Sequence, residues 1–209
     1  KAYDSKKINR ERIINFFFPN YKLKKFDIKN WSSRKHDFII VARNTKQKGF
    51  LEIEKFCLSI SNSYPSRPKI VIITNNLKKA VNLEELKRKL NPICDINFKT
   101  NLTNSEVLEH LTEAKIYFCL SHFEGFGMTI VESILSGCFI VTTNVGEQQY
   151  YLWPGRRLII NNTNSYKLDF NYINENGPSK ENFTKAKDFL HQNVKTYSES
   201  LRRIVMESN

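Results

Sequence analysis

Long apolar segments are absent from this sequence of 209 residues. No apolar run approaches the roughly 18 residues that a membrane-spanning helix needs. The first residues also lack the pattern of a secretory signal peptide. The chain starts at Lys1 and not at a methionine, as expected of a fragment of a longer protein. We therefore expect no membrane-spanning helix in this chain.

Cysteine and histidine are scarce. The four cysteines, Cys57, Cys94, Cys119 and Cys138, show no paired spacing, and the last two lie in apolar runs where thiols pack as small hydrophobic side chains. This pattern argues against a zinc site and indicates a reducing compartment, so we expect the protein to be cytoplasmic. The four histidines are scattered, and no His, Asp or Glu spacing near them predicts a metal site or a catalytic triad.

Acidic residues are outnumbered, because 33 Lys and Arg stand against 21 Asp and Glu, for a net charge of +12. A basic chain favours an anionic partner such as nucleic acid, a membrane surface or a phosphorylated substrate. Residues 1–36 hold eleven Lys and Arg but three acids, and so carry +8 of that charge. This segment fits a solvated surface, contact with a partner domain, or peripheral docking at the anionic inner face of a membrane.

Strand and helix patterns alternate along the chain. Short apolar runs rich in β-branched residues predict strands at 38–41, 69–74, 96–99, 116–120, 139–142 and 158–160. Apolar positions three or four apart predict helices between them at 50–61, 83–90, 105–114 and 128–136. This order predicts an α/β fold with a Rossmann-like, doubly wound parallel sheet, which binds ligands at the carboxyl ends of its strands.

The chain divides into three predicted parts. Residues 1–36 form a basic linker or interdomain segment, residues 37–177 form the Rossmann-like domain, and residues 178–209 form carboxyl-terminal helices that pack on it. Within the domain, Thr103 and Glu106 have the spacing of a capping box and predict a helix start. Residues 161–177 are rich in Asn and lack a period, which predicts a loop, and we expect the last helical segment to be broken near Asn193.

The most informative stretch is residues 121–132, SHFEGFGMTIVE, where a strand passes through a turn into a helix. Gly125 and Gly127, on either side of Phe126, allow a sharp turn and a close approach to a ligand. The unpaired amides of Gly127, Met128 and Thr129 at the helix start would meet a phosphate together with the positive end of the helix dipole. The stretch therefore predicts an anion site.

Two carboxylates, Glu124 and Glu132, flank this turn with seven residues between them. Ionised carboxylates only accept hydrogen bonds, so beside a diphosphate they suit the hydroxyl groups of a sugar and a ribose. A structural alternative is that Glu124 caps the helix and Glu132 is a solvated helix residue.

The pattern SxxEGFGxxxxE, followed by SGCFIVTT, resembles the signature of group-1 (GT4-type) retaining glycosyltransferases with the GT-B fold. Upstream, Arg43 and Lys48 match the family pattern Gly-Arg, four residues, Lys-Gly, although Ala42 replaces the usual glycine. The segment that contains Phe98 and Lys99 looks like the part of the family that binds the nucleobase. Residues 146–150, GEQQY, depart from the usual Gly-Gly-x-x-Glu of the loop that makes phosphate-side contacts in the family.

The resemblance implies the carboxyl-terminal, donor-binding half of a two-domain enzyme. Such an enzyme transfers a sugar from a nucleoside-diphosphate sugar to a glycan, lipid or protein acceptor, as in polysaccharide biosynthesis, without a metal or other cofactor. Acceptor groups would lie on a missing amino-terminal Rossmann-like domain.

The resemblance also implies roles for individual residues. Arg43, Lys48 and the helix amides would stabilise the leaving diphosphate. Glu124 would orient the sugar, and Glu132 would hold the ribose. An inactive donor-domain scaffold and a basic nucleic-acid-binding module are the alternatives, and we expect no nucleic acid partner.

Overall fold

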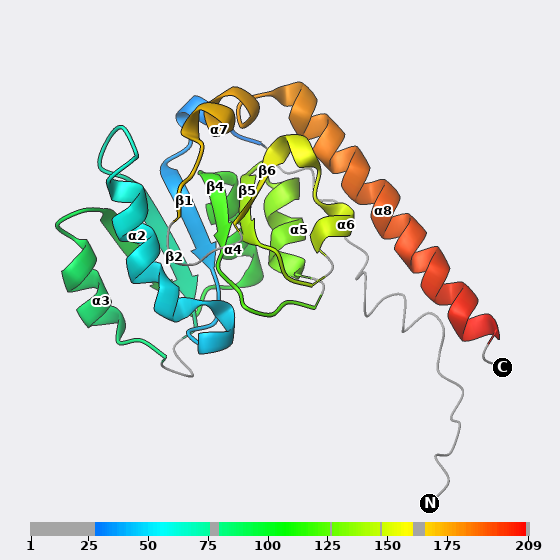
Figure 1. Ribbon diagram of the computed structural model, residues 1–209, viewed down its shortest axis with the longest axis horizontal. Coiled ribbons are helices and arrows are strands. Elements are labelled where there is room, and N and C mark those ends of the chain that lie inside the picture. Colours follow the sequence, from blue (N-terminus) through cyan, green and yellow to red (C-terminus); the bar gives the residue numbers. More distant parts are fainter. Residues whose placement is uncertain (1–27, 76–79, 126, 147, 161–165, 208–209) are drawn as a thin grey trace, which may run out of the picture.

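Six parallel strands form one sheet with helices on both faces (Figure 1). The computed structural model describes residues 28–75, 80–125, 127–146, 148–160 and 166–207. The strand order is β3-β2-β1-β4-β5-β6, which confirms the predicted doubly wound parallel sheet. The strands are β1 (His36–Val41), β2 (Lys69–Thr74), β3 (Asp95–Thr100), β4 (Ala114–Cys119), β5 (Phe139–Thr143) and β6 (Arg157–Ile160).

Alternate side chains of the strands enter two separate cores, one on each face of the sheet. Phe38 and Ile40 of β1 belong to one core and Ile39 to the other, and all three are buried. The first core is covered by α2 (Ile53–Ser61), α3 (Leu83–Leu90) and α7 (Phe170–Asn176). The second is covered by α4 (Asn104–Thr112), α5 (Met128–Leu135), α6 (Gln148–Tyr151) and α8 (Lys180–Glu207). Because both faces are covered, inner strands such as β2 and β5 are buried at nearly every position, whereas the edge strand β3 has exposed polar residues.

The strand order reverses between β1 and β4. The helices that follow β1 and β2 cover one face, whereas those that follow β3, β4 and β5 cover the other. The loops that leave β1 and β4 therefore diverge to opposite faces. Such a switch point leaves a crevice at the carboxyl ends of the two strands, where open α/β sheets bind their ligands.

The loop predicted over residues 161–177 is partly wrong. Residues 161–165 lie outside the described residues, but α7 occupies the second half of the range. Asp169 caps this helix by accepting a hydrogen bond from the amide of Tyr172 at 3.0 Å, and Ile173 is fully buried. The high Asn content concealed a short helix whose apolar positions, Phe170 and Ile173, lie one turn apart.

The predicted break near Asn193 is also wrong, since α8 is continuous through it. The Asn193 side chain donates a hydrogen bond to the carbonyl of Phe189, one turn earlier, at 2.8 Å. Bonding within its own helix accommodates a residue that usually favours turns. Among the described residues, neither α8 nor any other helix is both long and apolar enough to cross a membrane.

Two buried arginines join the segment before β1 to the segment before α8. Arg34 donates to the carbonyls of Ala114 and Ser136, and Arg156 donates to those of Gly137 and Gly177. Burial lowers the pKa of both groups, that of Arg156 to about 10. Residues 28–35, which are part of the predicted linker, therefore pack on the domain. We call the contacts of Arg34 and Arg156 the arginine corner. Residues 1–27 lie outside the described residues.

Candidate functional site

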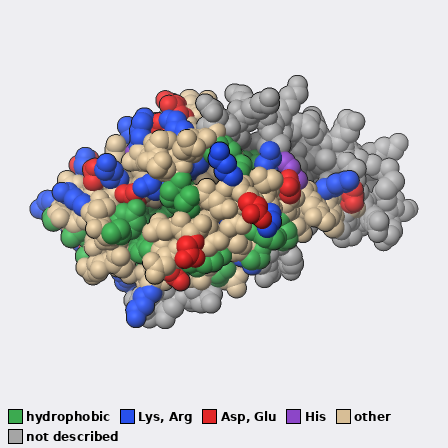
Figure 2. Space-filling view, turned by 90° about the horizontal axis from the view of Figure 1, so that it is seen from above, with side chains coloured by type: hydrophobic (Ala, Val, Ile, Leu, Met, Phe, Trp, Pro, Cys, Tyr) green, Lys and Arg blue, Asp and Glu red, His purple; other side chains and the backbone are tan. Residues whose placement is uncertain are grey.

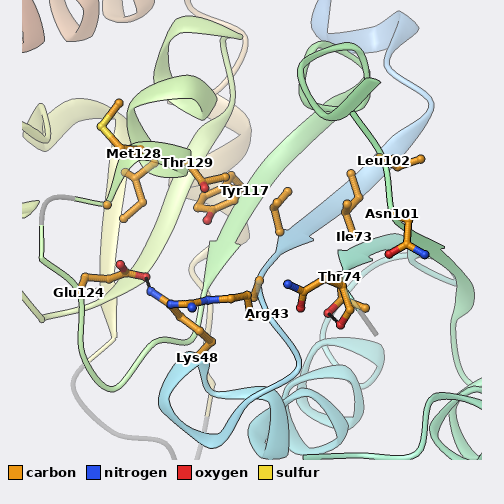
Figure 3. Close-up of a pocket in the computed structure, with 15 residues that line it drawn as sticks. Arg43, Lys48, Ile73, Thr74, Asn101, Leu102, Tyr117, Glu124, Met128 and Thr129 are labelled. Carbon is orange, nitrogen blue, oxygen red and sulfur yellow. Dashed lines mark hydrogen bonds and ion pairs between the residues drawn. The ribbon is translucent and has the colours of Figure 1, made fainter. Parts of the chain in front are cut away.

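A cavity of about 380 Å³ lies at the switch point, at the carboxyl ends of β1, β2 and β4 (Figure 3). Its size falls in the range of small-molecule sites. In Figure 3 the loop that carries Glu124 forms one side, and the ends of β2 and β3 form the other. The lining residues are Val41, Ala42, Arg43, Lys48, Ile73, Thr74, Asn75, Asn101, Leu102, Tyr117, Glu124, Gly127, Met128, Thr129 and Ile130.

The three residues predicted to be catalytic meet in this cavity. Lys48 Nζ lies 2.7 Å from Glu124 Oε1, and both side chains are about 15% exposed, at 16% and 14%. Ser121 Oγ donates to the same carboxylate oxygen at 2.7 Å. Arg43, at the end of β1, extends toward Glu124 (Figure 3). The cavity therefore holds two cations beside a carboxylate that is already oriented by two partners.

The loop that carries Lys48 is fixed against the end of β4 by Gly49. This glycine has φ +68°, and a Cβ there would lie 2.0 Å from the carbonyl oxygen of Leu120. Only glycine fits such a left-handed position in backbone contact. Nearby, the amide of His122 donates to the carbonyl of Gln47 at 2.9 Å. The β1–α2 and β4–α5 loops are therefore held together, and with them Lys48 and Glu124.

Helix α5 points its amino-terminal end at the cavity. Gly127 is the N-cap with φ +77° and no side-chain cap, and it lines the cavity together with Met128 and Thr129. The orphan amides of a first helical turn favour an anion there. Phe126 lies outside the described residues. The predicted anion site thus opens onto the same cavity as Arg43 and Lys48.

The structural alternatives for the two glutamates do not fit. The Glu124 side chain contacts Lys48 and Ser121, and the helix N-cap is Gly127, so Glu124 does not cap α5. Glu132 is 7% exposed and is therefore not a solvated helix residue. It does not line the cavity and lies one helical turn beyond Met128.

The loop after β5 reaches the glutamate loop despite its unusual sequence. Gly146 has φ +63°, and a Cβ there would lie 2.2 Å from the carbonyl oxygen of Glu124 and 2.7 Å from that of Gly125. Thr143 Oγ1 donates to the carbonyl of Ser121 at 2.5 Å. One glycine of the family's usual pair thus suffices to bring this loop against the backbone of Glu124.

The segment predicted to bind the nucleobase lines the cavity, but with residues that follow Phe98 and Lys99 in the chain. Phe98 packs against the core on one face of the sheet, and neither it nor Lys99 lines the cavity. Asn101 and Leu102 do so instead. Asn101 has φ +56°, a left-handed conformation that Asn tolerates better than most residues. An Asn directly after a strand is the sequence signal that could have identified it.

Tyr117 is a cavity residue that the sequence analysis missed. Burial raises its pKa, and the negative charges of neighbouring groups such as Glu124 and Glu132 add to the effect. The phenol therefore keeps its proton and can donate a hydrogen bond to a ligand. Its position in an apolar strand gave no sign of this role. The neighbouring Cys119 and also Cys138 are buried in the core, as predicted.

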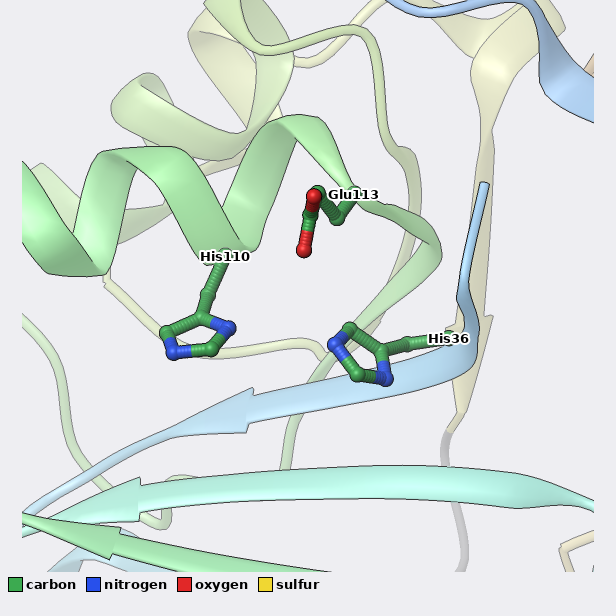
Figure 4. A group of neighbouring side chains, drawn as sticks. All are labelled: His36, His110 and Glu113. Atoms are coloured by element: carbon green, nitrogen blue, oxygen red, sulfur yellow. The ribbon is translucent and has the colours of Figure 1, made fainter. Parts of the chain in front are cut away.

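Two of the histidines regarded as scattered lie together. His36, His110 and Glu113 can bring one ligand atom each to within 4.8 Å of one another (Figure 4). These two histidines are therefore close in space, although they are far apart in the sequence. The spacing His-x-x-Glu at the end of a helix was the available local signal, because it places both side chains on one face.

The basic charge of the described residues is dispersed on the face that Figure 2 shows. Lys and Arg side chains stand at separate places there, with Asp and Glu between them. Nucleic-acid binders, in contrast, usually gather Lys and Arg in a patch or stripe.

The chain is similar to known proteins in sequence and in fold. Residues 22–188 match the family described as Glycosyl transferases group 1. The chain is 24% identical over 176 residues to a poly(glycerol-phosphate) alpha-glucosyltransferase of Bacillus subtilis, which covers 79% of this chain and 24% of that protein. This chain therefore spans about a quarter of the length of that curated relative.

Two solved structures show the fold. The C-terminal domain of a group 1 glycosyl transferase from Francisella tularensis has a TM-score of 0.56 and 22% identity, with 75% of this chain and 85% of that one covered. Sucrose-phosphate synthase from Thermosynechococcus elongatus has a TM-score of 0.61 and 13% identity, with 84% and 47% covered. The chain belongs to the group 1 glycosyl transferase family, and its fold is that of the carboxyl-terminal half of a GT-B enzyme.

Proposed function

We propose that this chain binds a nucleoside-diphosphate sugar as the donor half of a retaining glycosyltransferase. The observation that carries the proposal is the convergence of Arg43, Lys48, Glu124 and the start of α5 in one cavity at the switch point. The acceptor of the sugar would be a glycan, a lipid or a protein. A cytoplasmic place at the inner face of a membrane remains a prediction from the basic residues 1–36.

The positive groups of the cavity suit a diphosphate. Arg43 and Lys48 would each make a charge-assisted hydrogen bond to its oxygens, and the amides of Gly127, Met128 and Thr129 would add the positive end of the α5 dipole. Lys48 and the helix amides would be held in place before the ligand arrives, since Lys48 pairs with Glu124 and the left-handed Gly49 and Gly127 fix the two loops. Charge that develops on the leaving diphosphate would thus be stabilised by the chain itself, without a metal.

Glu124 suits the hydroxyl groups of the sugar. Among the described residues, both of its side-chain contacts fall on Oε1, one from Lys48 and one from Ser121. Oε2 can therefore accept a hydroxyl while Lys48 lies between the carboxylate and the phosphate. This geometry would couple recognition of the sugar to recognition of the diphosphate. Tyr117 and Asn101 supply further hydrogen-bonding groups on the cavity wall.

Binding is expected without turnover in this chain alone. The cavity lies at the carboxyl ends of the strands, and the acceptor groups are expected on a second domain. Sugar transfer by these 209 residues alone would contradict the proposal that a second domain supplies the acceptor groups.

Saturation-transfer NMR with UDP-, GDP-, ADP- and dTDP-sugars would identify the donor, and calorimetry would then test the site. Arg43→Gln and Lys48→Gln should each weaken binding about 10- to 150-fold, because each removes a charged hydrogen bond worth roughly 1.5–3 kcal/mol. Lys89→Gln is the matched control, since Lys89 is 48% exposed on α3. Equal affinity in all four proteins would remove the proposal.

The same titrations at two salt concentrations test the nucleic-acid alternative. A nucleic-acid binder loses affinity steeply with salt, whereas a preorganised diphosphate site should lose little. Tighter binding of an oligonucleotide than of any nucleoside diphosphate, with a steep salt dependence, would favour the alternative.

A further inference from the structure

Three potential metal ligands lie together near the amino-terminal ends of β1 and β4 (Figure 4). The donor cavity lies at the carboxyl ends of the same strands. His36 is the first residue of β1, whereas the cavity begins at Val41, five residues further along the strand. At about 3.3 Å per residue, the two places are roughly 16 Å apart. His110 lies in the last turn of α4, and Glu113 follows that helix.

The backbone holds these residues at fixed positions. The amide of His36 donates to the carbonyl of Glu113 at 3.0 Å, and His36 pairs with Ala114 in the parallel register of β1 and β4. The amide of Glu113 in turn donates to the carbonyl of Glu109 at 3.2 Å. The three side chains are therefore carried by a strand start and a helix end that are bonded to each other.

The ligand atoms are available. His110 Nδ1 is buried and finds no hydrogen-bond partner among the described residues, an arrangement that native proteins usually avoid. The two imidazole rings have their centroids 5.9 Å apart and are tilted by 47°, so they do not stack. The Glu113 side chain is 7% exposed, and its ion pairs with Lys29 and Lys35 both fall on Oε1, at 2.5 and 2.6 Å.

We propose that His36, His110 and Glu113 form a binding site for a divalent transition-metal ion, with Zn²⁺ as the best match. Two imidazole nitrogens and one carboxylate oxygen are a ligand set that Zn²⁺ accepts, with water in the fourth position. Mg²⁺ and Ca²⁺ prefer oxygen ligands and would be excluded. This site is separate from the donor cavity and takes no part in sugar transfer.

The lysines fit this assignment as outer partners. Metal-binding carboxylates are commonly held by further hydrogen bonds, and Lys29 and Lys35 hold Oε1 while leaving Oε2 for the ion. Their side chains are 40% and 66% exposed, so either ammonium can move into water if the charge of the ion repels it. The ion would tie β1 and α4 together, and through Lys29 also the segment before β1.

The test uses the whole chain, freed of metal with a chelator and titrated with Zn²⁺ and, separately, Mg²⁺ in a calorimeter. We expect one Zn²⁺ per chain, no heat with Mg²⁺, and a rise in melting temperature with Zn²⁺ only. His36→Gln and His110→Gln should each weaken Zn²⁺ binding at least about tenfold, by analogy with the losses caused by outer-shell changes. Co²⁺ should give a visible absorption band that the two variants lose.

His191→Gln is the matched control, because this histidine is exposed on α8 and lies outside the cluster. Far-UV circular dichroism would establish that each variant is folded. Three results would overturn the assignment: no Zn²⁺ binding by the wild-type chain, unchanged binding in both cluster variants, or an equal loss in His191→Gln. If the buried cysteines bound Zn²⁺ instead, binding would be unchanged in both cluster variants.

Discussion

Two glycines of the donor site should respond in opposite ways to the same substitution. At Gly49 an added Cβ would fall 2.0 Å from the carbonyl oxygen of Leu120 in a left-handed conformation, whereas at Gly125 it would meet nothing within 4 Å and φ is not left-handed. The protein itself therefore requires glycine at 49 but not at 125. If a ligand approaches the backbone at Gly125, only that ligand requires glycine there.

The magnitudes follow from these contacts. Gly49→Ala carries a left-handed penalty of about 1–2 kcal/mol and a backbone shift that costs about 1–3 kcal/mol, together about 2–5 kcal/mol. For a chain of this size that corresponds to a fall in melting temperature of about 4–20 °C. Gly125→Ala should change stability by less than about 0.5 kcal/mol. Its methyl group should clash with the donor by about 1–3 kcal/mol, which weakens binding about 5- to 150-fold.

The assay is a pair of measurements on each variant: thermal unfolding by circular dichroism, and calorimetric affinity for whichever of UDP, GDP, ADP and dTDP binds tightest. Gly49→Ala should lose both stability and affinity, because Lys48 moves with its loop. Gly125→Ala should lose affinity alone. The reasoning is refuted if Gly125→Ala destabilises the chain as much as Gly49→Ala, or if it binds the nucleotide like the wild type.

Four further outcomes are expected. Glu132→Gln should weaken nucleotide binding in calorimetry, and unchanged affinity would show that this buried carboxylate does not hold the ribose. Asn44→Ala should lower the free energy of unfolding in urea by about 2–3 kcal/mol, because the buried Asn44 side chain satisfies backbone groups of Ala80 and Val81; a loss below about 0.5 kcal/mol would contradict this. Arg156→Leu should cost about 2–6 kcal/mol, since it leaves two buried carbonyls without their donor, and a wild-type urea midpoint would speak against it. Burial raises the pKa of Cys138 to about 11, so its thiol should resist alkylation at pH 8 until the chain unfolds; mass spectrometry would reveal early labelling.

The sheet was predictable because its strands are buried on both faces. Residues 70–73, for example, are apolar at every position, a pattern typical of strands in a parallel sheet that is covered on both faces. The capping box at Thr103 was also readable, and both of its hydrogen bonds are present. Short elements rich in Asn, such as α7, could not be predicted. Their local composition predicts a loop, whereas the burial of Ile173 in the core stabilises the helix.

Within the site, residues in a motif were predictable and residues brought in by packing were not. Arg43, Lys48 and Glu124 were predicted from the family motifs that they match, and they lie in one cavity. Tyr117 looked like an ordinary strand residue, since its role depends on which face of the sheet it occupies. His36 and His110 are 74 positions apart, and only the register of β1 on β4 brings them together.

The arginine corner has a mechanical consequence. The segment that leads into β1 and the segment that leads into α8 are both fastened there, by Arg34 and Arg156, and the ring of Trp31 lies against Gly177. A pulling force applied at residues 28 and 180 would therefore act on the hydrogen bonds of Arg34 and Arg156 before it acts on any strand of the sheet. For a pull at these two residues, the hydrogen bonds of Arg34 and Arg156 would have to break before the six strands bear tension.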